Sequence, residues 1–128
     1  MTGASGYGAS GMSATKSFYN IIVNNDSSSD RVKFAGAGEI HCHNNFTIVR
    51  GIASKYNTSD YDAIIKGILR IDDGEAFEWY KVGSAGDVEA GIIENHGTFS
   101  SPEATGKVYV GGIRNLGTYT NNGATIEH

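Results

Sequence analysis

The chain has 128 residues, which is enough for one domain with a modest hydrophobic core. Its formal net charge is −4 and its Lys and Arg residues form no cluster, which argues against a nucleic-acid groove and against binding to an anionic membrane surface. The 18 glycines against a single proline are typical of an ordered β-structure with many tight turns.

Cysteine usage and the absence of targeting signals bear on the compartment. Cys42 is the one cysteine in the sequence, so no intrachain disulfide can form. No apolar segment is long enough to span a bilayer, and the N-terminal residues lack the basic start and apolar run of a signal peptide. We therefore expect the chain to reside in the cytosol or in a particle assembled there.

Residues 1–16 are predicted to form an extended, flexible arm, separate from a single β-rich domain over residues 17–128. A Gly-Ala-Ser-Gly segment occurs twice within the arm, and no charged residue precedes Lys16. Such a segment cannot bury a core of its own, so we expect it to contact a neighbouring subunit. The arm residues expected to bind a partner are Gly3, Gly6, Tyr7, Gly8 and Gly11.

The first half of the domain contains two predicted strands and one alternating segment. Residues 17–23 and 31–34 are predicted strands, joined by a polar loop over residues 24–30. After a glycine-rich turn, Ile40 and Cys42 are expected to face one side of the next strand while His41 and His43 face the other.

The middle of the chain is ambiguous. Residues 60–71 have apolar residues at the spacing of a short helix, although Gly67 weakens that prediction, and helix and strand both remain open. An acidic turn follows. Residues 76–82 then alternate large aromatic residues, which predicts a strand that covers a core or an oligomer interface.

The last third nearly repeats itself. Residues 91–99 return as residues 112–119, and the residues that carry the repeat are Gly91, Ile92, Asn95, Gly97, Gly112, Ile113, Asn115 and Gly117. A repeat of about twenty residues rich in β-branched residues, Asn and Gly is typical of chain wound in stacked coils. The predicted fold class is therefore all-β, a short β-solenoid (β-helix), with a β-sandwich or jelly roll as the alternative.

The repeat also predicts which side chains stack. Gly-Ile pairs recur with the second residue at Ile52, Ile68, Ile92 and Ile113, with glycine expected at a corner and isoleucine pointing inward. Asn, Thr and aromatic residues at matching positions are expected to stack from coil to coil. A stack this short has open ends, so we expect self-association, with a trimer favoured.

Few residues suggest chemistry. His41 and His43 could hold a metal ion only if a threefold axis brought three chains together, because two ligands do not make a site. Cys42 lies among apolar residues and is expected to be a core thiol. No cofactor is expected.

The acidic residues and aromatic residues offer two further interpretations. The acids near the turn are Asp60, Asp62, Asp72, Asp73, Glu75 and Glu78. Many solenoids cut polysaccharides with acidic residues, but these acids lie in turns, where Asp is common, and such enzymes usually have more coils. Asp72, Asp73 and Glu75 could hold calcium, although they lack the spacing of a calcium-binding loop. Phe77, Trp79 and Tyr80 could instead contact a partner or stack on a glycan.

The glycine-serine arm and the coil-like repeat over residues 85–128 resemble β-structured virion proteins of bacteriophages, namely capsid decoration (cement) proteins and short tail fibres or spikes. His41-Cys42-His43 is similar to the His-x-His iron sites of trimeric tail spikes. The resemblance implies a non-enzymatic structural subunit of a virus particle that contacts other virion proteins. The alternatives are a self-polymerising filament protein similar to the bactofilins, and a carbohydrate-binding or carbohydrate-cleaving module that uses Glu78, Trp79 and Tyr80.

Overall fold

The computed structural model describes residues 8–9, 16–34, 39–55, 61–79, 86–103 and 106–128. These residues form strands and connecting turns, and none of them forms a helix long and apolar enough to cross a membrane. The strands are β1 (Gly8–Ala9), β2 (Lys16–Phe18), β3 (Ile21–Asn24), β4 (Arg31–Phe34), β5 (Glu39–Cys42), β6 (Phe46–Arg50), β7 (Ile52–Lys55), β8 (Asp62–Ile71), β9 (Ala76–Glu78), β10 (Val88–Asn95), β11 (Thr98–Glu103), β12 (Lys107–Asn115), β13 (Thr118–Asn122) and β14 (Thr125–Glu127).

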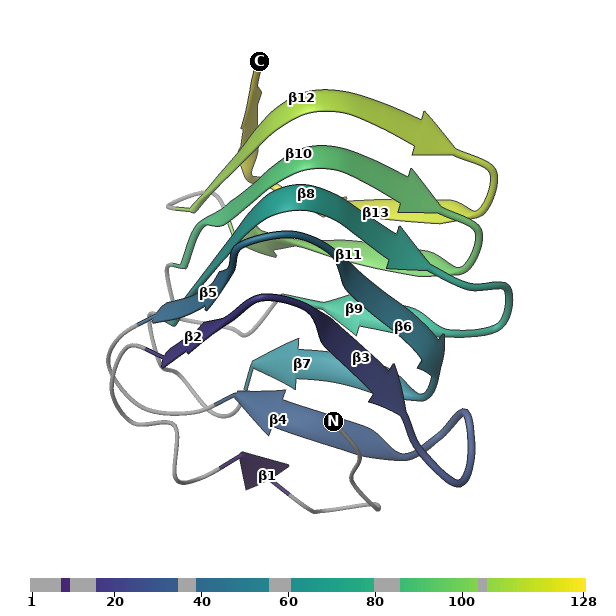
Figure 1. Cartoon of the computed structure of the whole chain (residues 1–128). Coiled ribbons are helices and arrows are strands. Elements are labelled where there is room, and N and C mark those ends of the chain that lie inside the picture. The colour runs from purple at the N-terminus through teal and green to yellow at the C-terminus, as the bar shows by residue number, and fades with distance from the viewer. Residues whose placement is uncertain (1–7, 10–15, 35–38, 56–60, 80–85, 104–105) are drawn as a thin grey trace.

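The chain winds as a β-solenoid of about four turns (Figure 1). One sheet has the order β1-β4-β7-β9-β11-β13, and the other has the order β14-β12-β10-β8-β5-β2. In this second sheet β6 also pairs with β8, and β3 pairs with β6. The strand pairs within both sheets are parallel. A sandwich or jelly roll would be antiparallel, so the solenoid prediction is confirmed.

The coils differ in length along the chain. Val88 pairs with Ala63 in the coil below and with Val108 in the coil above, so these two steps take 25 and 20 residues. The coils with more residues contain longer loops between their strands. The repeat is therefore regular only in the last coils, where no long loop interrupts it.

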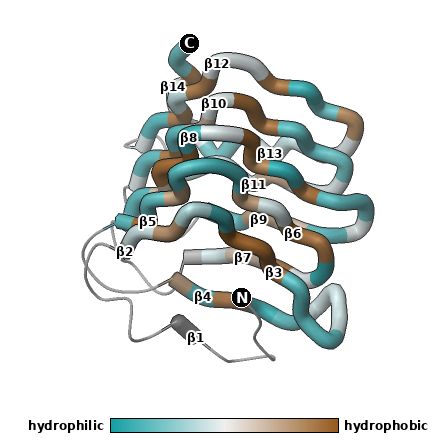
Figure 2. Tube along the Cα trace, in the orientation of Figure 1, coloured by the Kyte–Doolittle hydropathy of each residue, from teal (hydrophilic) through white to brown (hydrophobic). Residues whose placement is uncertain are grey.

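The core lies between the two sheets and consists of columns of inward side chains. Figure 2 shows apolar segments recurring in successive coils. One column runs through Ile21, Phe46, Leu69, Ile93 and Ile113, which are aligned in register. The first four are at most 3% exposed. Burying each such side chain contributes about 1.5–3 kcal/mol, so the columns are the main source of stability.

An aromatic column fills the opposite sheet's side of the core. Phe77, Phe99 and Tyr119 are aligned on β9, β11 and β13. Their ring centroids lie 5.7 and 5.1 Å apart, with interplanar angles of 5° and 27°. The expected stacking of aromatic residues from coil to coil is confirmed for Phe99 and Tyr119.

The predicted role of the Gly-Ile pairs is partly wrong. Ile92 pairs with Gly112, so Gly91 is aligned with Gly111 and the sequence alignment was one residue out of register. Because side chains alternate faces along a strand, Ile92 and the aligned Ile68 point outward, and Ile92 is 46% exposed. Ile113 points inward as predicted, in register with Ile93.

The predictions for Ile52 and Gly112 are also wrong. Ile52 lies on β7 in the other sheet, aligned with Arg31 and Ala76, and so belongs to a different column. A Cβ added to Gly112 would meet no atom within 4 Å, so Gly112 is not a required corner glycine.

The ambiguous segment is a strand. Residues 62–71 form β8, with the buried side chains of Ala63, Ile65, Leu69 and Ile71 facing the core. Leu69 and Ile71 follow the two-residue period of a strand, and Ala63 and Ile65 do the same on the other side of Gly67. Opposite Gly91 the pairing register shifts by one residue between these two halves. This shift puts the inward residues of β8 at the spacing that also suggests a helix.

The predicted early strands are confirmed, with one division. Residues 31–34 form β4, whereas the segment 17–23 is split between β2 and β3. Of the arm, Gly8 and Ala9 form β1, which pairs with Lys33 and Phe34 of β4. The other arm residues expected to bind a partner, Gly3, Gly6, Tyr7 and Gly11, lie outside the described residues.

Candidate functional site

The two histidines of the sequence motif lie on the outer surface, as predicted. His41 is on β5, and its Nε2 lies 2.7 Å from Glu39 Oε1. The ring centroids of His41 and His43 are 6.3 Å apart. Within the described ranges, no three His, Cys, Asp or Glu side chains are grouped so that they could hold a metal ion. A metal site on this motif therefore still requires ligands from other chains.

Cys42 is a core thiol, as predicted. It is fully buried, and its Sγ donates to the carbonyl oxygen of Asn45 at 3.1 Å. Burial raises the pKa of the Cys42 thiol, which keeps it protonated and unreactive at neutral pH.

Two of the acidic residues near the turn, Glu75 and Glu78, bond to earlier coils. Glu75 is 8% exposed, and its carboxylate accepts hydrogen bonds from the Gly51 N–H at 2.5 Å and the Ser28 hydroxyl at 2.8 Å. Glu78 forms an ion pair with Arg31 at 2.5 Å. Glu75 thus joins segments from three successive coils, which is a structural role. Asp60 lies outside the described residues.

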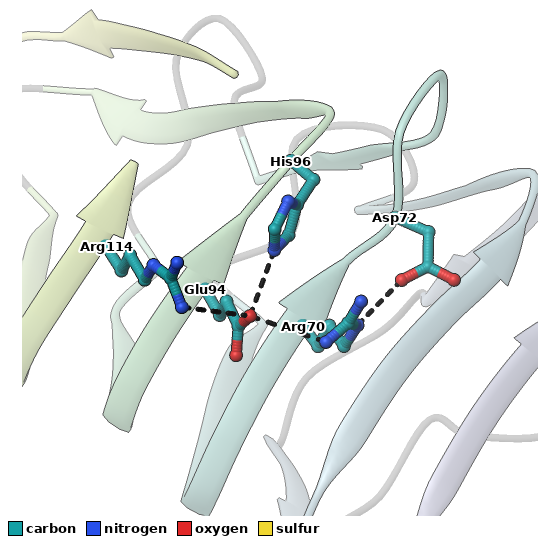
Figure 3. A network of polar contacts seen from close by, with 5 residues as sticks. All are labelled: Arg70, Asp72, Glu94, His96 and Arg114. Atoms are coloured by element: carbon teal, nitrogen blue, oxygen red, sulfur yellow. Dashed lines mark hydrogen bonds and ion pairs between the residues drawn. The ribbon is translucent and has the colours of Figure 1, made fainter. Parts of the chain in front are cut away.

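Alternating charges also join the coils on the outer face of the second sheet (Figure 3). Glu94 is aligned between Arg70 and Arg114, at 3.4 and 4.0 Å from their guanidinium nitrogens. His96 Nε2 lies 2.9 Å from Glu94 Oε1. The hydrogen bond from His96, followed by the nearby Arg70 charge, lowers the pKa of the Glu94 carboxyl.

Arg70 completes this network. Its Nε donates to Asp72 at 2.8 Å, and this bond raises the pKa of the Arg70 guanidinium. Each of these exposed ion pairs contributes little by itself, so the network aligns the coils more than it stabilises them.

Phe77 and Trp79 do not form a binding surface, which corrects the prediction that they contact a partner or a glycan. Both side chains are fully buried, and their rings stack at 4.7 Å. The Trp79 Nε1–H donates to the Tyr61 carbonyl oxygen at 2.9 Å. Both belong to the core of the chain itself. Tyr80, the third member of that set, lies outside the described residues.

The C-terminal end of the solenoid is only partly covered by the described residues. The last coil consists of β12 and β13. Beyond it, only β14 pairs with β12, through Lys107, Val108 and Tyr109. The remainder of β12 and residues Thr118 to Thr120 of β13 have no paired strand on that side among the described residues.

The side chains at this end are exposed or half-buried. Leu116 is 61% exposed, and Asn115, Thr118 and Thr120 are also exposed. Tyr119 is half-buried, and its hydroxyl group has no hydrogen-bond partner among the described residues. Sequence reasoning anticipated an open end but not these residues, because exposure depends on which strand lies above them.

The predicted repeat contacts meet at this end. The Asn95 Nδ2 donates to Asn115 Oδ1 at 2.8 Å, which confirms the expected stacking of asparagines. It also donates to the Thr118 carbonyl oxygen at 2.9 Å, and so fixes the turn between β12 and β13. Gly97 and Gly117 are stacked directly, since a Cβ on Gly117 would lie 2.2 Å from the Gly97 oxygen.

Comparison with known proteins gave no relative: no protein-family model, no curated protein and no solved structure matches the chain.

Proposed function

We propose that this chain is a structural subunit of a larger assembly and acts through contacts between subunits. The observation that carries the proposal is the uncovered edge of the last coil. Unpaired strand edges readily pair with strands of another chain, and short solenoids need a cap or a neighbour at each end.

The polar side chains support a structural role as well. The carboxylates of Glu75 and Glu94 bond to groups in adjacent coils, and that of Glu78 pairs with Arg31 two coils below. A carboxylate used in this way stabilises the stack and is not free to act on a substrate.

The more specific form of the proposal is a subunit of a virus particle, either a capsid decoration protein or a short tail fibre or spike of a bacteriophage. The glycine-serine repeat of residues 1–16 supports it, because an extended arm can clasp a neighbouring subunit. This form predicts that mass spectrometry of purified virus particles finds the chain at a fixed copy number. Its absence from the particles would overturn the virion role.

The first test of assembly is the native mass of the purified chain by light scattering, with negative-stain images of the same sample. A discrete oligomer supports the proposal, and the trimer expected from the sequence would appear at three times 13.6 kDa. A chain that stays monomeric at high concentration, alone and with purified particles, contradicts it.

A second candidate is a self-polymerising filament protein similar to the bactofilins. The observation that favours it is the unbroken alignment of inward columns along the solenoid axis, from Ile21 to Ile113. Long filaments formed by the pure chain would select this candidate over the virion subunit.

A further inference from the structure

We propose that Asn122 is a site of spontaneous deamidation that the folded last coil protects, and that its conversion keeps this coil open. Asn122-Gly123 is the one Asn-Gly pair in the sequence. Asparagine is a chemically labile residue, and a following glycine favours the reaction because it has no side chain to hinder attack by its own nitrogen. The inference concerns chemistry within one chain, so it is independent of the proposed function.

The reaction needs only water. The Gly123 nitrogen gives up its proton to solvent and attacks Asn122 Cγ, so that a C–N bond forms. The bond from Cγ to Nδ2 breaks, and the amide nitrogen takes up a proton and leaves as ammonia. Water then opens the succinimide ring at Cγ, which gives aspartate, or at the main-chain carbonyl carbon, which gives isoaspartate. Both products carry a carboxylate in place of a neutral amide.

The fold holds both reacting groups in other bonds. The Asn122 Nδ2 donates to Ser100 Oγ at 2.9 Å and to the Ser101 carbonyl oxygen at 2.8 Å, both on β11 in the coil below. The Gly123 N–H donates to Asn121 Oδ1 at 2.9 Å. The amide and the nitrogen must leave these acceptors before the ring can form, so the closed coil slows the reaction.

The hydroxyl group of Ser101 fixes both asparagines. Ser101 is fully buried, and its Oγ lies 3.2 Å from Asn121 Oδ1 and accepts a hydrogen bond from the Asn122 N–H at 2.9 Å. The acceptor of the Gly123 N–H and the main chain of Asn122 are therefore both tied to β11. Protection of the site depends on the contact between β13 and β11.

The site lies at an end of the stack, where local opening is expected. Residues Thr118 to Thr120 of β13 have no paired strand on the outer side among the described residues. The pairing of β13 with β11 is also irregular next to the site, because the register shifts between Ser100 and Glu103. Segments at the edge of a fold open without unfolding the whole domain, so deamidation proceeds through the open form of the last coil.

The product does not fit the closed coil. A carboxylate cannot donate the two hydrogen bonds that Nδ2 makes, and it would face the carbonyl oxygen of Ser101. Asn122 is aligned with Glu103, so the new negative charge would also lie beside an acidic residue. Isoaspartate in addition lengthens the main chain, which disturbs the strand. Conversion therefore favours the open coil.

The experiment follows the conversion of Asn122 in the full chain by peptide mass spectrometry during incubation at neutral pH. A synthetic peptide of residues 118–126 gives the rate without the fold. Ser100→Ala and Asn121→Ala each remove one acceptor of the reacting groups. Thr120→Ala, at an exposed side chain of the same strand, is the matched control.

We expect the folded chain to deamidate about tenfold more slowly than the peptide, because only the open fraction reacts. Ser100→Ala and Asn121→Ala should react faster than the parent, and Thr120→Ala should not. Equal rates in the folded chain and the peptide, or unchanged rates in both acceptor variants, would overturn the inference.

Hydrogen exchange of Asn122→Asp, which carries the aspartate product, tests the effect of conversion. The amides of β13 should exchange faster than in the parent, while those of β8 and β10 keep the parent rates. Unchanged exchange in β13, or faster exchange throughout the chain, would show that the product does not open the last coil and would also overturn the inference.

Discussion

Replacing two glycines of the repeat by alanine should have opposite effects on stability. A Cβ on Gly97 would lie 2.2 Å from the Glu75 carbonyl oxygen and 2.5 Å from that of Asp72. A Cβ on Gly112 would meet no atom within 4 Å. The two substitutions are chemically identical, so the difference between them measures the stacking of the coils.

The expected magnitude follows from these distances. A carbon needs more than ~3 Å from an oxygen, so the coil at Gly97 must move by about 1 Å, at a cost of about 1–3 kcal/mol. The same movement stretches the hydrogen bond from the Thr98 N–H to Glu75, now 2.9 Å, which adds about 1 kcal/mol. Gly112→Ala should be neutral or stabilise by about 0.4–1 kcal/mol, because alanine reduces the entropy of the unfolded chain.

The assay is urea unfolding followed by tryptophan fluorescence. Trp79 is the one tryptophan and is fully buried, so its emission reports loss of the core. We expect the free energies of unfolding of the two variants to differ by about 2–5 kcal/mol, with Gly97→Ala the less stable. Equal midpoints, or a less stable Gly112→Ala, would refute the register assigned to the last coils.

Three further changes test other parts of the stack. Phe99→Ala should lower the free energy of unfolding by about 3–5 kcal/mol in the same urea assay, because it empties a fully buried site between two stacked rings. Glu75→Ala should cost about 1–3 kcal/mol by leaving the buried Gly51 N–H without an acceptor, and Glu75→Gln should cost less. Glu94→Gln should be less stable than the parent above the ordinary carboxyl pKa of 4.5, and the difference should vanish as pH falls through the lowered pKa of Glu94.

Each of these predictions has a control. Phe99→Leu keeps most of the volume, so it should lose clearly less than alanine; an equal loss would mean that the site collapses around any change. A Glu75→Ala variant as stable as the parent would show that the bonds of the Glu75 carboxylate to neighbouring coils do not stabilise the fold.

Because the pKa of Glu94 is lower in the folded chain than in the unfolded chain, its charge stabilises the fold above the unfolded pKa, and this stabilisation is lost in acid. If the free energies of unfolding of the parent and Glu94→Gln changed in parallel with pH, the charge network around Glu94 would not contribute to stability.

The turns of the last coils were predicted well because they make strict chemical demands. Asn95 and Asn115 bond to each other at the end of their strands. Gly97 and Gly117 stand where a Cβ would strike a carbonyl oxygen in the coil below. Residue identity is restricted at such positions, so the repeat is visible in the sequence.

The register of the strands was harder to predict. Gly111 and Gly112 are adjacent, and the sequence alone does not tell which of them aligns with Gly91. The structure aligns Gly111, because Ile92 pairs with Gly112. A slip of one residue exchanges the two faces of a strand. For this reason the prediction that Ile92 is buried is wrong, and its neighbour Ile93 is the buried residue.

The columns of the earlier coils were harder to predict because a solenoid core constrains polarity and volume more than residue identity. The column that ends in Ile93 and Ile113 begins with Ile21, Phe46 and Leu69, which share no residue pattern beyond being apolar. Loops of different lengths separate them, so the repeat has no fixed period there. Exposure at the C-terminal end was equally hard to predict. The residues of the last turn, such as Asn115 and Thr118, resemble those of the coil below, and they are exposed because no described strand pairs with them on the outer side.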